Sequence, residues 1–106
     1  MSDKTVTSTK IGHYFPMITE ILEKHFGDYK VKVYLYGSRA RKEEHAASDI
    51  DLAVKSSGSI DYQISVAKEA FFESHIPYKV DLVDFKTAGK NLKESIKKDG
   101  VLIWQS

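Results

Sequence analysis

The sequence has 106 residues, of which 42% are hydrophobic and 29% charged. This length and composition predict one globular domain over 1–106, with residues 1–10 flexible. The formal net charge of +1 argues against direct nucleic-acid binding. Because there is no cysteine, disulfides, thiolate catalysis and Cys-based zinc sites are excluded, as is usual in the cytoplasm. No apolar run approaches the roughly 20 residues that span a membrane, and the start lacks the apolar centre of a signal peptide, so we expect a soluble, cytoplasmic protein without membrane contact.

The chain alternates between segments of helical and of strand periodicity. Apolar residues recur at spacings of three and four in the helical segments, and they alternate with polar residues in the strand segments. Ser59 and Thr87 are the expected caps of the two later helices. In chain order we predict a helix over 16–26, a strand over 31–36, a short exposed helix over 38–44, a strand over 49–55, a helix from 60 to about 75, a strand over 78–85, a helix closed by Asp99-Gly100, and a short strand or tail over 101–104.

This order of elements predicts the α/β class. Strands interspersed with helices indicate a small mixed β-sheet with helices packed on one face, which leaves the other face for chemistry. Two aromatic pairs leave alternatives open. Tyr34 and Tyr36 share the polar face of their strand and either line a cleft or simply pack, and Phe71 and Phe72 are either core residues or partner-facing ones.

Two aspartates occupy alternate positions of the strand over 49–55. Residues i and i+2 of a strand project from one face about 6.5 Å apart, so the side chains of Asp49 and Asp51 can converge. Two such carboxylates repel each other by about 3 kcal/mol at 5 Å and an effective dielectric near 20. A Mg²⁺ ion with substrate phosphates would remove that cost. The competing interpretation is a solvated sheet face with two ordinary surface carboxylates.

A Gly-Ser pair ends the preceding strand. Gly37 permits close approach of a backbone, and Ser38 offers a hydroxyl and backbone N–H groups where a helix is expected to begin, an arrangement suited to phosphate. Arg39 and Arg41 lie close by and are suited to phosphate oxygens. The competing interpretation is a charged exposed helix in which these arginines pair with the glutamates that follow.

The two motifs together resemble a known signature. Gly37-Ser38, ten intervening residues (39–48) and Asp49-Ile50-Asp51 are similar to the signature of the polymerase-beta-like nucleotidyltransferase superfamily. The texts YGSRAR, SDIDLAV and VDLVD resemble its minimal nucleotidyltransferases, the MntA-type antitoxins of HEPN/MNT toxin–antitoxin pairs. The resemblance implies the polymerase-beta-like fold, two Mg²⁺ ions and ATP as nucleotide substrate. It places catalysis and metal binding on Asp49, Asp51 and Asp81, and nucleotide binding on Gly37, Ser38 and Arg39.

Two aspartates compete for the role of the third carboxylate. Asp81 alternates with Val80 and Leu82 and so faces away from the apolar side, whereas Asp84 ends the strand and is expected to turn into solvent or cap a loop. We therefore choose Asp81, as the general base for an attacking hydroxyl. Many relatives have a glycine soon after the arginines where this chain has Lys42, so the choice of Arg39 over Arg41 stays open.

The resemblance also implies an activity and a partner. We expect Mg²⁺-dependent transfer of AMP from ATP to a hydroxyl, a tyrosine of a small helical HEPN-type toxin, in a homo- or hetero-oligomer that acts as a toxin–antitoxin pair. The alternative is a catalytically silent module that neutralises its partner by binding alone. A free-standing enzyme acting on a small hydroxylated molecule usually needs a further domain.

Overall fold

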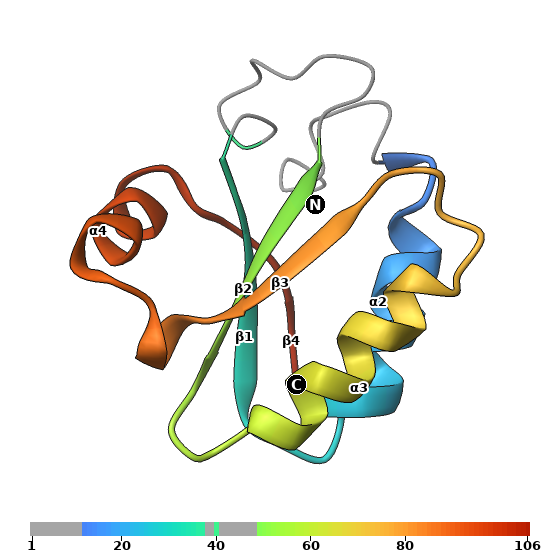
Figure 1. Cartoon of the computed structure of the whole chain (residues 1–106), viewed down its shortest axis with the longest axis horizontal. Helices are drawn as coiled ribbons and strands as arrows, with labels where there is room; N and C mark the ends of the chain where they lie inside the picture. Colours follow the sequence, from blue (N-terminus) through green and yellow to red (C-terminus); the bar gives the residue numbers. More distant parts are fainter. Residues whose placement is uncertain (1–11, 38–39, 41–48) are drawn as a thin grey trace.

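The chain forms a four-stranded mixed sheet with the strand order β3-β2-β1-β4 (Figure 1). This computed structural model describes residues 12–37, 40 and 49–106. The inner strand β1 pairs antiparallel with both β2 and β4, whereas β2 pairs in parallel with the edge strand β3. The strands are β1 (Val31–Tyr36), β2 (Ile50–Ser56), β3 (Val80–Asp84) and β4 (Val101–Gln105).

Two helices, α2 (Phe15–Phe26) and α3 (Asp61–Phe72), cover one face of the sheet. Their apolar stripes meet the alternate residues of the strands, as the predicted periodicities require. The resulting core is centred on Ile18, Leu22, Phe26, Val33, Leu35, Ile50, Leu52, Val54, Ile60 and Leu82, all of them fully buried or nearly so. The predicted mixed sheet and the four strand positions are confirmed.

The last helix, α4 (Lys90–Asp99), lies on the opposite side of the sheet from α2 and α3 in Figure 1. Its Ile96 joins Tyr36 and Ala53 in a second, smaller buried cluster. The expectation that helices pack on one face therefore holds for α2 and α3 but not for α4. The other face is partly covered, and its chemistry is restricted to the part that α4 leaves open.

Both predicted helix caps are wrong, and in each case packing or local hydrogen bonding explains the difference. The N-cap of α3 is Ile60 rather than Ser59, because Ile60 is fully buried and its burial fixes where the helix begins. The N-cap of α4 is Gly89. Thr87 instead belongs to a short 3-10 helix, where its hydroxyl donates to the carbonyl oxygen of Asp84 (3.4 Å).

The predicted end of the third helix near His75 is also wrong. Helix α3 ends at Phe72, because the hydroxyl of Ser74 turns back to donate to the carbonyl oxygen of Phe71 (2.7 Å). Residues 1–10, expected to be flexible, lie outside the described residues, as does the expected helix over 38–44 apart from Ala40. Within the part of the chain that is described, no helix has the length and apolar character needed to cross a membrane.

Candidate active site

The sheet places three functional side chains in one row across three strands. Asp51 is the register partner of Tyr36 on β1 and of Asp81 on β3. Register partners on neighbouring strands lie on the same face, with about 4.8 Å between strands. The row faces away from the α2 and α3 side, because Ile50, Leu52 and Leu82 point into that core. The sheet thus brings Asp51 and Asp81 together, as alternation in the sequence predicts.

Gly37 closes the row at the end of β1, and its backbone conformation explains why glycine stands there. Its φ angle is +81°, a region that residues with a side chain rarely adopt. A Cβ atom at this position would lie 2.5 Å from the Oδ2 atom of Asp51. The carboxylate of Asp51 therefore rests against the bare Cα of Gly37, and the Gly-to-Asp spacing in the sequence corresponds to direct packing between the two motifs.

Tyr36 is the residue of this site that the sequence reasoning left open. It is 7% exposed and belongs to the small cluster under α4. Its burial raises the pKa of the phenol to about 12, and the negative charges of Asp51 and Asp81 contribute in the same direction. A phenol is neutral at physiological pH in any case, and the raised pKa keeps Tyr36 neutral beside the carboxylates at alkaline pH as well. The sequence held a signal for it: Tyr36 lies on the polar face of its strand, as Asp51 does, and it directly precedes Gly37.

The remaining carboxylates fall into different positions. Asp49 is exposed and directly precedes β2. The next residue, Ile50, donates its N–H to the carbonyl oxygen of Lys79 (2.8 Å). Asp84 caps the 3-10 helix Phe85–Thr87, because its Oδ1 accepts the N–H of Lys86 (2.9 Å). The prediction that Asp84 caps a loop is confirmed. It leaves Asp81 as the carboxylate of β3 in register with Asp51.

The donor set suits a hard divalent cation that also binds a substrate. Within 12–37, 40 and 49–106, no group of three or more His, Cys, Asp or Glu side chains is able to hold a metal ion by itself. Mg²⁺, however, is usually held by one or two carboxylates together with water and substrate phosphates. Two carboxylates in register, with no cysteine or histidine between them, therefore fit a Mg²⁺ ion that arrives with a nucleotide.

The other predicted nucleotide contacts cannot be placed. Ser38 and Arg39 lie outside the described residues, as does Arg41. The N–H of Ala40 donates to the carbonyl oxygen of Gly37 (3.1 Å), and the Ala40 side chain packs against the main core. This contact keeps Ala40 close to Gly37 at the end of β1.

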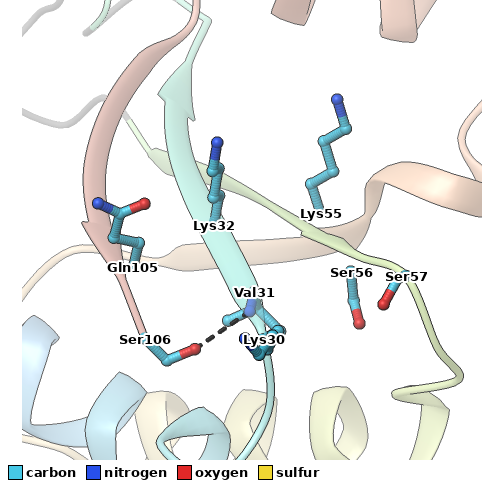
Figure 2. Close-up of a pocket in the computed structure, with 8 residues that line it drawn as sticks. All are labelled: Lys30, Val31, Lys32, Lys55, Ser56, Ser57, Gln105 and Ser106. Carbon is cyan, nitrogen blue, oxygen red and sulfur yellow. Dashed lines mark hydrogen bonds between the residues drawn. The ribbon is translucent and has the colours of Figure 1, made fainter.

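The opposite end of the same sheet carries positive charge. A hollow of about 390 Å³ lies between the start of β1 and the ends of β2 and β4. Figure 2 shows Lys32 and Lys55 extending in the same direction from neighbouring strands, and the two are register partners. The hydroxyl of Ser106 accepts the N–H of Val31 (3.1 Å) and so ties β4 to β1. This hollow is far from the carboxylates and contains none of the predicted site residues.

Comparisons with known proteins agree with the fold. The model of the family described as "Polymerase beta, Nucleotidyltransferase" matches residues 17–106. A Haemophilus influenzae protein named probable protein adenylyltransferase MntA is 36% identical over 88 residues, which are 82% of this chain and 75% of that protein. The protein adenylyltransferase MntA of Shewanella oneidensis is 31% identical over 72 residues, 68% of this chain and 52% of that protein.

A solved structure extends this similarity to three dimensions. It is described as a toxin–antitoxin crystal structure with AMP-PNP, and its TM-score is 0.72 at 25% identity over 87% of this chain and 73% of that one. The predicted polymerase-beta-like fold and the predicted resemblance to MntA-type enzymes are both confirmed. The chain belongs to the polymerase beta nucleotidyltransferase family.

Proposed function

We propose that this nucleotidyltransferase moves AMP from ATP to a hydroxyl group of a partner protein, in a Mg²⁺-dependent reaction at Asp49, Asp51 and Asp81. The observation that carries the proposal is the register of Asp51 with Asp81, together with the packing of Asp51 on Gly37. Relatives named as protein adenylyltransferases support AMP as the transferred group and a protein as the acceptor. The neighbour with AMP-PNP supports ATP.

The bound Mg²⁺ ions, two by family resemblance, would neutralise phosphate charge and polarise the α-phosphate. In the chain itself, the carboxylate of Asp81 accepts the proton of the acceptor hydroxyl, whose oxygen then attacks the α-phosphorus. One P–O bond forms, the bond to the bridging oxygen of the β-phosphate breaks, and pyrophosphate leaves with that electron pair. Asp49, Asp51 and Asp81 would hold the cations, and Gly37, Ser38 and Arg39 would hold the triphosphate.

The neutral phenol of Tyr36 has a supporting role in this scheme. A deprotonated phenolate would add a third negative charge beside Asp51 and Asp81 and would itself compete for the cation. A tyrosine is already protonated at neutral pH, and burial raises the pKa of Tyr36 further, so its phenol can donate a hydrogen bond toward a carboxylate. The phenol can therefore fix a carboxylate in place without changing the charge of the site.

The proposed acceptor is a tyrosine of a small helical HEPN-type toxin, with which the chain forms a cytoplasmic toxin–antitoxin complex. The toxin–antitoxin neighbour supports a toxin as the partner. The HEPN type and the tyrosine are what the family resemblance implies. In this proposal modification of the toxin, rather than binding alone, neutralises it.

The test is transfer of label from α-labelled ATP to the product of the neighbouring reading frame. We expect Mg²⁺-dependent labelling that the double change Asp49→Asn and Asp51→Asn abolishes, with loss of toxin neutralisation. If the double variant neutralises the toxin as well as the unmodified chain does, the chain acts by binding alone and the catalytic proposal is wrong.

A further inference from the structure

An apolar groove runs from the end of α3 to the edge strand β3 and reaches Asp81. Its volume is about 480 Å³, within the range of small-molecule and peptide side-chain pockets. Figure 1 shows that α3 ends at the same end of the sheet at which β3 begins. Apolar residues form most of the lining of the groove, together with two lysines and Asp81; the apolar residues are Phe71, Phe72, Ile76, Tyr78 and Val80. We call it the α3–β3 groove.

Phe72 is the unusual residue of this groove. It is 89% exposed, whereas Phe71 beside it is 3% exposed and lies in the core. The structure thus separates two aromatic residues that the sequence leaves undecided. A phenylalanine exposed to this degree gains nothing for the fold, and an aromatic ring is a strong anchor for a partner once it is covered.

The walls of the groove are held in place before any ligand arrives. The ring of Tyr78 packs edge-on against the ring of Tyr14, with 5.8 Å between centroids. The N–H of Ile76 donates to the hydroxyl of Ser74 (3.3 Å), and the same hydroxyl closes the end of α3. Because the walls are already ordered, covering them costs little conformational entropy.

The charges at the groove indicate what it takes. Lys68 and Lys79 are exposed and line its rim, and Asp81, the proposed base, lies on the same lining. The side chain of Asp81 faces away from α3, but β3 is an edge strand, so the outer edge of that strand joins the groove to the Asp81 carboxylate. A polypeptide seated in the groove can therefore bring a hydroxyl around this edge to Asp81.

We infer that the α3–β3 groove binds the segment of the acceptor protein that carries the hydroxyl, with an apolar side chain over Phe72 and a carboxylate beside Lys68 or Lys79. The inference rests on the proposed function, which names a protein acceptor. It adds that protein acceptors are selected at this groove and not by the nucleotide site.

The matched variants are Phe72→Ser and Tyr62→Ser. Both residues are exposed aromatics on α3, 89% and 74% exposed, but Tyr62 is not in the lining and lies ten residues, about 15 Å along the helix, from Phe72. Removing an aromatic anchor of this size should raise the KM for the partner by about 10- to 100-fold. We expect this for Phe72→Ser alone, with AMP-PNP affinity and kcat unchanged in both variants.

Equal behaviour of the two variants overturns the inference. The inference is also wrong if Phe72→Ser dissociates a homodimer and leaves transfer unchanged, because the groove would then join two copies of this chain. Failure of the proposed function is recognised separately, since the unmodified chain would then transfer no label. In that case the dissociation constant for the partner still tests the inference. If the groove binds the partner segment, Phe72→Ser lowers the affinity for the partner and Tyr62→Ser does not.

Discussion

At one end of the sheet Asp51 lies beside Asp81 across β2 and β3, and at the other end Lys32 lies beside Lys55 across β1 and β2. Both pairs place like charges in register, which is unfavourable in either case. The aspartates are half-buried and short, and Asp51 is confined by Gly37. The lysines are exposed on long flexible stems, and the ammonium of Lys55 lies 5.3 Å from the ring centroid of Phe85.

The difference shows that a like-charge pair alone does not mark a site. Long exposed side chains separate their charges in water, and salt screens what remains. Short carboxylates held against a glycine and a buried phenol have no such freedom. The carboxylate end is therefore expected to concentrate function, and the lysine end to tolerate change.

The largest expected effect is that of Asp51→Asn. Transfer of label from α-labelled ATP should fall at least about 100-fold, the usual loss when one group that stabilises transition-state charge is removed. The thermal midpoint should stay the same or rise, because the repulsion with Asp81 is relieved. Transfer at an undiminished rate would show that the carboxylate row is not the catalytic site.

Gly37→Ala should give the second largest effect, on stability and activity together. The φ angle of +81° and the 2.5 Å approach to Oδ2 of Asp51 predict a loss of about 1–3 kcal/mol in the free energy of unfolding, measured with urea. The matched control is Gly58→Ala near the lysine end, where a Cβ atom would meet nothing within 4 Å. The control should change stability by less than about 0.5 kcal/mol, and equal losses would contradict the packing described for Gly37.

Tyr36→Phe tests the raised pKa. Tyr36 ionises near pH 10 in the unfolded chain and at about 12 in the folded one, so between these values only the unfolded state loses its proton. The contribution of Tyr36 to stability is thus fully present below pH 10 and falls by up to about 1.4 kcal/mol per pH unit as the pH rises toward 12. In urea unfolding at several pH values, the variant should show a shallower decline than the unmodified chain. Identical slopes would mean that the phenol of Tyr36 is not buried beside the carboxylates.

Lys32→Gln should give the smallest effect. Relief of the repulsion with Lys55 should stabilise the fold by less than about 0.5 kcal/mol at low salt, and the gain should vanish at high salt. Transfer activity should stay within about twofold of the unmodified chain, as for a surface position away from the site. A loss of transfer as large as that of Asp51→Asn would give the lysine end a catalytic role and remove the distinction between the two ends.

Much of the carboxylate end could be predicted from the sequence, because strand alternation has a period of two. That period places Asp51 and Asp81 opposite the apolar residues and separates Asp81 from Asp84, and the structure agrees on both points. The turn residue Gly37 was also identifiable, although its contact with Asp51 was not. A contact between strands depends on register, which the local sequence does not contain.

Other features depend on tertiary packing and could not be predicted. The apolar residues Leu92 and Ile96 indicate an amphipathic helix but not the face of the sheet on which α4 packs. Burial of Ile60 overrides the capping preference of Ser59. Phe71 keeps the helical spacing of the buried Ile64 and Ala67 and Phe72 does not, which favours Phe71 for the core, but the packing of α3 on the sheet settles it.

A single measurement can test whether the carboxylate end of the sheet, and not the lysine end, binds metal and nucleotide. Mn²⁺, a paramagnetic substitute for Mg²⁺, is titrated into the ¹⁵N-labelled protein with AMP-PNP, and amide signals are followed by NMR. We predict that the amide signals of Gly37, Asp51 and Asp81 broaden first, while those of Lys32 and Lys55 stay sharp. Without AMP-PNP the broadening at the carboxylates should be much weaker. Broadening that is absent from the carboxylate row, or equal at both ends of the sheet, would contradict the assignment of this site to metal and nucleotide.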